Sequence, residues 1–125
     1  MEEELINELL ELPKLIKEKQ YDILQLQKQL RFVQYRKREI EDKITLDVVG
    51  EKDKWNKPKF SNVDARRAEI SRRLRENREF QEIAEYEREL LEMINKEKIE
   101  LEYLRNRFSG IKHYMRYISS LGDEL

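Results

Sequence analysis

The sequence has no cysteine and little glycine or proline: 3 and 2 residues of 125. Without cysteine, disulfide bonds and thiolate chemistry are excluded. Glycine and proline mark most turns, so their scarcity predicts few turns and long secondary-structure elements. A compact sheet or a mixed α/β domain needs more turns than this sequence offers, which favours an all-α fold.

Catalytic residue types are scarce as well. His113 is the only histidine, and the three glycines are isolated. A catalytic triad, a histidine-containing metal site and a glycine-rich phosphate loop therefore lack their residues. We expect a binding protein that is not an enzyme and has no cofactor. The remaining metal alternative is a carboxylate site built across several helices or subunits.

Signals for membrane insertion or export are also missing. No apolar run approaches the roughly 20 residues of a membrane span. The start, Met1-Glu2-Glu3-Glu4, is acidic and lacks the basic region of a signal peptide. We therefore expect a soluble, cytoplasmic protein with no membrane partner.

What the sequence does contain is charge, at 42% of residues, with apolar residues in narrow stripes. The first stripe alternates steps of three and four residues, which is a heptad seam and predicts helix packing on helix. Pro13 interrupts this stripe, so we expect a short helix over 2–11 and a long helix over 13–47, with a single helix kinked at Pro13 as the alternative. The stripe consists of Leu5, Leu9, Leu12, Ile16, Ile23, Leu26, Leu30, Val33, Ile40 and Ile44.

A second stripe follows, from Val63 to Ile118. Ser61 or Asn62 can cap the start of a helix, with Asp64 in its positive first turn. We expect a second long helix over 62–109. Gly110 predicts a break, followed by a short helix over 111–120.

The segment 48–61 contains Gly50, Asn56 and Pro58 and is predicted to be a basic loop. Residues 45–49 and 57–60, near its two ends, could pair as a short β-ribbon. The predicted fold is a single domain, 1–125: a long antiparallel, coiled-coil-like helical hairpin with short terminal helices.

The two long helices differ in length, which leaves part of the second stripe without a partner. An apolar stripe should not stand in water, so we expect a homodimer or a higher oligomer. Tyr103, Phe108, Tyr114 and Tyr117 lie in the same region, where aromatic residues are usually core or interface, with a ligand pocket as the alternative. The expected oligomer interface is Leu101, Leu104, Phe108, Ile111 and Met115.

Charge is unevenly distributed, although the net charge is only −1. Residues 51–79 carry 10 basic and 6 acidic side chains, and the flanking regions are net acidic. Arginine and lysine with aromatics in a loop are typical of nucleic-acid contact. Alternatively, the arginines pair with Glu39, Glu41, Asp42, Glu69, Glu76 and Glu79, while Trp55 and Phe60 cap the core. The candidate contact residues are Lys52, Lys54, Trp55, Lys57, Lys59, Arg66, Arg67, Arg72, Arg73 and Arg75.

Two segments carry a resemblance to known proteins. Ser61 to Ile70 is followed by Arg73-Leu74, Asn77 and Phe80-Gln81, and Ile99 to Arg105 reads Ile-Glu-Leu-Glu-Tyr-Leu-Arg. This pattern resembles small coiled-coil proteins of phages and prophages, which are similar to accessory factors found among recombination and replication genes. The resemblance implies a phage accessory protein close to nucleic-acid metabolism or host defence.

Three functions remain open at this point. The first is an accessory factor that binds DNA, or a protein that processes DNA, through the basic end. The second is an inhibitor or adaptor that binds a host defence protein through its helical faces. The third is a structural oligomer that acts as a spacer or scaffold.

Overall fold

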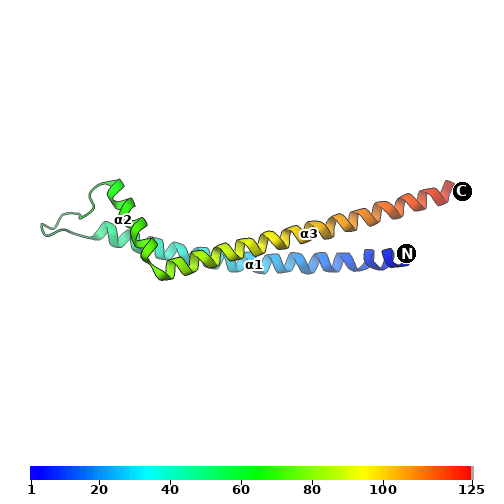
Figure 1. Ribbon diagram of the computed structural model, residues 1–125, viewed down its shortest axis with the longest axis horizontal. Coiled ribbons are helices and arrows are strands. Elements are labelled where there is room, and N and C mark those ends of the chain that lie inside the picture. Colours follow the sequence, from blue (N-terminus) through cyan, green and yellow to red (C-terminus); the bar gives the residue numbers. More distant parts are fainter. Residues whose placement is uncertain (125) are drawn as a thin grey trace. The chain divides into compact units, whose positions relative to one another are not determined.

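The computed structural model describes residues 1–124 and contains three helices (Figure 1). They are α1 (Glu2–Gly50), α2 (Val63–Glu76) and α3 (Arg78–Glu124). Residues 1–124 contain no β-strand, so the prediction of an all-α protein with two long helices is confirmed. The chain divides into two compact units: unit 1 is 1–27 with the chain from residue 92 on, and unit 2 is 28–91.

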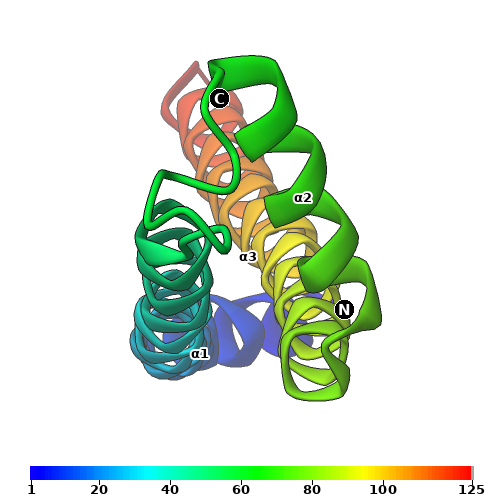
Figure 2. The ribbon, with the colours of Figure 1, turned by 90° about the vertical axis from the view of Figure 1, so that its left-hand side faces the viewer.

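Unit 2 has a small apolar core contributed by all three helices. Ile40, Ile44 and Val48 are four residues apart on one face of α1 and are buried, Val48 completely. Helical side chains at this spacing lie above one another and form a continuous stripe. Figure 2 shows the end of α1, α2 and the first turns of α3 around this core, joined by the loop. The side chains that pack on the stripe are Phe60, Ile70, Leu74, Phe80 and Ile83.

The start of α2 is fixed by a side-chain cap. Asn62 is extended, and its Oδ1 accepts a hydrogen bond of 2.7 Å from the backbone N–H of Ala65. This bond satisfies one of the free N–H groups of the first turn, which Asp64 also stabilises through the helix dipole. Asn62 is one of the two caps that the sequence offered.

The helix that we expected over 62–109 is broken at Asn77, which was not predicted. Asn77 is extended (φ −81°, ψ 111°), and its Oδ1 accepts from the Phe80 N–H at 2.8 Å. The Gln81 side chain donates to the Leu74 carbonyl at 3.0 Å. Asn77 therefore caps α3, and Gln81 binds a carbonyl of the last turn of α2, so both helix ends are satisfied. The break lets Leu74 and Phe80 reach the same core.

In unit 1, residues of α1 pack on residues of α3. The buried side chains are Leu12, Ile23, Ile94, Leu101 and Ile111. Glu8 receives two hydrogen bonds from Arg107, at 2.6 and 2.9 Å. Lys19 replaces an apolar residue in the heptad stripe, and its Nζ lies 2.8 Å from Glu97 and 2.7 Å from Glu100. These carboxylates raise the pKa of Lys19, so the stripe accommodates the cation.

The predicted breaks at Pro13 and Gly110 were wrong, because α1 and α3 continue through them. Proline inside a helix costs about 3 kcal/mol because it lacks an N–H and crowds the preceding turn. Leu12 is 2% exposed, so packing on one side of the proline offsets this cost, while Pro13 itself faces solvent. Gly110 costs about 1 kcal/mol relative to alanine, and buried Ile111 next to it keeps the helix on its partner.

The predicted ribbon over 45–49 and 57–60 was also wrong. Residues 45–49 belong to α1, where buried Val48 holds the last turn in place. The loop begins only at Glu51, and its single pairing of strand type joins Lys52 to Pro58. The helices of residues 1–124 contain no stretch long and apolar enough to cross a membrane.

Candidate nucleic-acid interface

The loop between α1 and α2 is a tight hairpin organised by Asp53. The Asp53 N–H donates to the Lys57 carbonyl at 2.8 Å, and the Asn56 N–H donates to the Asp53 carbonyl at 3.0 Å. The Asp53 carboxylate accepts from the N–H groups of Trp55 (2.8 Å) and Lys57 (3.0 Å). Asn56 has a φ of 62°, a left-handed conformation that asparagine tolerates better than most residues. The loop is therefore ordered by its own sequence.

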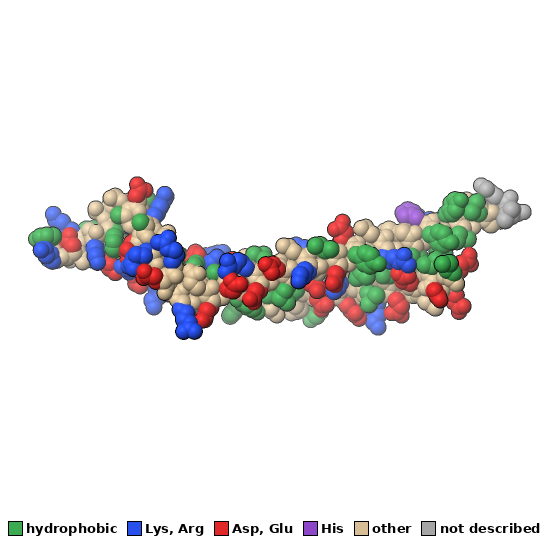
Figure 3. Space-filling view, viewed as in Figure 1, with side chains coloured by type: hydrophobic (Ala, Val, Ile, Leu, Met, Phe, Trp, Pro, Cys, Tyr) green, Lys and Arg blue, Asp and Glu red, His purple; other side chains and the backbone are tan. Residues whose placement is uncertain are grey.

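Trp55 lies at the tip of this hairpin and is 69% exposed. Tryptophan is on average a well-buried residue, so an exposed one on an ordered loop requires an explanation. The Nζ of Lys54 lies 4.5 Å from the ring centroid, which is a cation–π contact. Figure 3 shows hydrophobic and basic side chains together at the end of the loop. The indole is available for stacking, and the positive charge lies beside it.

Phe60, the second aromatic residue of the loop, has a different role. It is half-buried and packs on the core of unit 2. The Lys59 Nζ lies 5.5 Å and the Arg73 guanidinium 6.0 Å from its ring centroid. The interpretation that both aromatics cap the core is therefore right for Phe60 and wrong for Trp55.

Two of the candidate arginines are engaged in ion pairs. Arg72 binds Glu69 and Glu76, with contacts as short as 2.5 and 2.8 Å. Arg73 binds Glu69 at 2.8 Å and Glu51 at 2.7 Å. Hydrogen bonds from Arg72 and then Arg73 lower the pKa of Glu69 to about 2. Arg73 therefore joins α2 to the start of the loop, whereas Arg72 pairs along α2.

The other candidate cations divide into two groups. Lys59 is 3.9 Å from Glu51, and Arg66 donates to the Phe60 carbonyl at 3.5 Å, so both contact the chain itself. The remaining side chains have no carboxylate within 4.0 Å among residues 1–122, and all are exposed. This free group is Lys52, Lys54, Lys57, Arg67 and Arg75.

The ion pairs expected at the basic end are present in part. The arginines do pair along α2 with Glu69 and Glu76, but their other carboxylate is Glu51 in place of Glu39, Glu41 or Asp42. Sequence reasoning missed Glu51 and Asp53 as organising residues. An aspartate shortly before an asparagine in a short loop is a turn signal that would have identified Asp53.

The residues predicted for an oligomer interface lie in unit 1. Leu101 and Ile111 are buried within the chain, and Leu104, Phe108 and Met115 are partly buried. Of the C-terminal aromatics, Tyr103 and Tyr117 are 67% and 62% exposed. Oligomerisation therefore stays a prediction, and Leu101 and Ile111 already have partners without it.

Two further kinds of site were considered in the sequence, a carboxylate metal site and a site at His113. Residues 1–122 contain no group of three or more histidine, aspartate or glutamate side chains placed to hold a metal ion. His113 is exposed on α3. Comparison with protein-family models, with curated proteins and with solved structures finds no match to this chain.

Proposed function

We propose that the chain binds single-stranded nucleic acid through the loop and the exposed side of α2. The observation that carries this proposal is Trp55, which is exposed on a loop ordered by Asp53 and has the unpaired Lys54 beside its ring. Base stacking on an aromatic ring and phosphate contact with lysine or arginine are the two usual parts of such a site.

Each part of the site has a distinct task. The lysines of the loop neutralise phosphates, and Trp55 stacks on a base that has no pairing partner. Bases of an intact duplex are already stacked, so duplex DNA offers the lysines a partner but not the indole. Because every base has a flat face, we expect a preference for single strands with little preference for sequence.

We also propose that α1 and α3 run antiparallel as one helical hairpin that supports the loop. The contacts Glu8–Arg107 in unit 1 and Lys37–Glu87 in unit 2 support this, since the contact later in α1 is made with the earlier residue of α3. The resemblance to phage coiled-coil proteins supports a non-enzymatic, cytoplasmic accessory factor.

A charge-reversal experiment tests the site. Fluorescence anisotropy measures binding of a labelled oligonucleotide of about 16 nucleotides, the upper end of the usual site size. The triple variant K52E/K54E/K57E reverses free loop lysines and should abolish binding. The control K14E/K17E/K98E makes the same change in net charge on exposed lysines of unit 1 and should bind normally. Equal binding by both variants would contradict the proposed site.

Salt dependence provides an independent check. With three to five cations on phosphates, log K should fall with log salt with a slope between about −2 and −3.5 for a single strand. A slope near zero would point instead to a protein partner. That second candidate has one observation in its favour, since exposed tryptophan and arginine are also the side chains enriched in protein–protein hot spots.

A further inference from the structure

Unit 1 carries a second surface that the proposed site does not use: an apolar groove between residues of α1 and α3. It contains two hollows of about 480 and 420 Å³. Leu15, Tyr103 and Leu104 line the first hollow together with four charged residues: Glu18, Lys19, Asp22 and Glu100. Leu5, Gly110 and Ile111 line the second, where the missing side chain of Gly110 leaves open space: a Cβ there would meet nothing within 4 Å.

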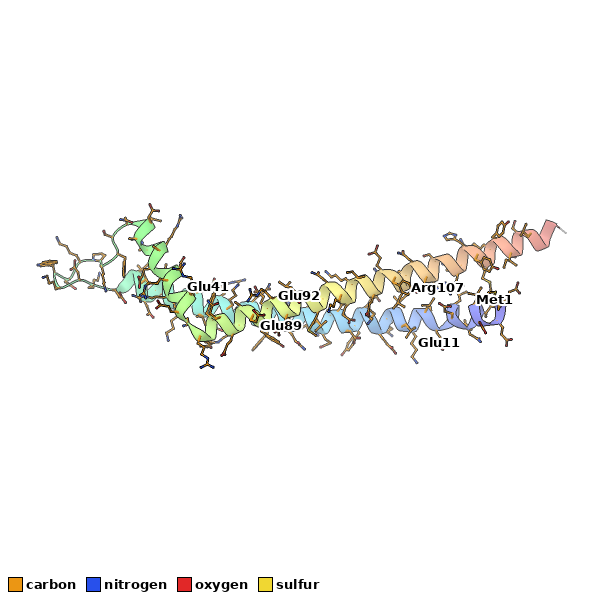
Figure 4. The ribbon with its side chains drawn as sticks, viewed as in Figure 1. Met1, Glu11, Glu41, Glu89, Glu92 and Arg107 are labelled. Atoms are coloured by element: carbon orange, nitrogen blue, oxygen red, sulfur yellow. The ribbon has the colours of Figure 1, made fainter. Side chains whose placement is uncertain are left out.

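The spacing of the hollows matches the repeat of a helix. Leu104 and Ile111 are seven residues apart on α3, which is two helical turns or about 10.5 Å. A helix that lies along the groove presents apolar side chains at positions i and i+7 with the same spacing. Arg107, which is labelled in Figure 4, lines the second hollow and is bound to Glu8. The groove can therefore receive two side chains of one amphipathic helix.

The charge around the groove specifies the polar side of that helix. A row of acidic side chains on α1 recurs at helical spacing, so its members share one face of the helix. Its exposed members make the α1 side of the groove acidic. Of this row, only Glu8 has a basic partner within 4.0 Å among residues 1–124. Residues 1–27 carry 7 acidic and 3 basic side chains. The acidic row is Glu4, Glu8, Glu11, Glu18 and Asp22.

The α3 side of the groove contains two exposed tyrosines beside Glu100, Asn106 and Arg107. Tyr103 is 67% and Tyr114 47% exposed, and each lines one of the hollows. Tyrosine is enriched among the residues that carry binding energy at interfaces, because its ring packs and its hydroxyl stays solvated. In Figure 3, hydrophobic side chains lie along the line between α1 and α3 in unit 1, with acidic side chains along α1.

We propose that this groove docks a basic amphipathic helix of a partner protein. Apolar side chains of the partner would fill the hollows, and its lysines or arginines would face the acidic row. A second copy that docks groove to groove fits less well, because it would bring the acidic row against another acidic row or against tyrosines. The arrangement is the helix-in-groove mode of recognition, with charge complementarity for orientation.

The test uses a synthetic helical peptide of about 18 residues, with leucines at helical spacing and lysines elsewhere. A scrambled peptide of the same composition and a peptide with glutamate in place of lysine are the controls. Fluorescence anisotropy with the full chain should show binding of one amphipathic lysine peptide per chain, and at least tenfold weaker binding of both controls.

Two protein variants locate the binding site. Gly110→Leu adds a side chain at the open hollow, where a Cβ would meet no atom within 4 Å, and should weaken peptide binding at least tenfold. Ser109→Leu adds the same side chain at an exposed neighbour outside the hollows and should bind normally. Glu11→Lys with Glu18→Lys, both exposed, should give a loss like that of Gly110→Leu, which guards against a folding defect of one variant.

Three outcomes would overturn the proposal. These are unchanged binding by Gly110→Leu, equal binding of the lysine and glutamate peptides, or a dimer of the unmodified chain that Gly110→Leu converts to a monomer. The last outcome would assign the groove to a second copy. The oligonucleotide site lies on unit 2, so K52E/K54E/K57E should leave peptide binding unchanged, and each proposal can fail alone.

Discussion

Replacement of Trp55 by alanine should weaken binding to single-stranded nucleic acid and leave the fold intact. The residue is 69% exposed, and no buried side chain depends on it. Surface substitutions of this kind change the free energy of unfolding by within about 0.5 kcal/mol. Loss of one base–aromatic stack costs about 1–3 kcal/mol of binding, which corresponds to a Kd raised roughly 5- to 150-fold. The effect on binding therefore exceeds the effect on folding.

Anisotropy with a single-stranded oligonucleotide measures the loss, and circular dichroism during heating measures stability. Phe32→Ala is the matched control, since Phe32 is 75% exposed on α1 in the same unit but outside the loop. Duplex DNA should bind Trp55→Ala and the unmodified chain alike, because the lysines remain. If Trp55→Ala binds single strands as well as Phe32→Ala does, the indole has no part in binding.

Four further predictions concern the fold, the loop and pH. Val48→Ala should lower the free energy of unfolding by about 2–3 kcal/mol in a denaturant titration, because Val48 is completely buried. The control Val49→Ala, at a half-exposed neighbour, should change the free energy of unfolding by less than about 0.5 kcal/mol. Asp53→Ala should weaken oligonucleotide binding although it removes a negative charge; tighter binding would show that charge matters more than loop order. Arg72 and Arg73 lower the pKa of the Glu69 carboxyl from 4.5 to about 2. Its contribution to stability is therefore present above pH 4.5 and is lost as the pH falls toward 2, and Glu69→Gln should flatten this part of the curve of melting temperature against pH. Gly110→Ala should raise the free energy of unfolding by about 0.5–1 kcal/mol, since alanine favours the helix and its Cβ meets no other atom; a loss of stability would show that the glycine is needed for its backbone.

Sequence patterns predicted the long helices well because the heptad stripe is a repeated signal. Ile40 and Ile44, both taken as stripe residues, are buried in the core of unit 2. Local breaking signals were less reliable. Pro13 and Gly110 disfavour helix by about 3 and 1 kcal/mol, and packing of the neighbouring Leu12 and Ile111 outweighs them.

The break at Asn77 was missed for the opposite reason. Asparagine is only a weak helix breaker within a charged run, and its role depends on the cap formed with Phe80 and on the Gln81 side chain. The candidate site was predicted as a set of residue types. Which cations are free could not be predicted, because it depends on Glu51 and Glu69 being within reach of Arg73.

The hydrogen bonds of Asp53 also have a kinetic and thermodynamic consequence. A flexible loop must be ordered when a partner binds, and each rotamer-rich side chain that becomes fixed costs about 0.5–1.5 kcal/mol. The backbone of the Asp53–Lys57 turn is already bonded before any encounter. Association through this turn should therefore proceed without a slow conformational step, and differences in affinity among partners should arise mainly in their dissociation rates.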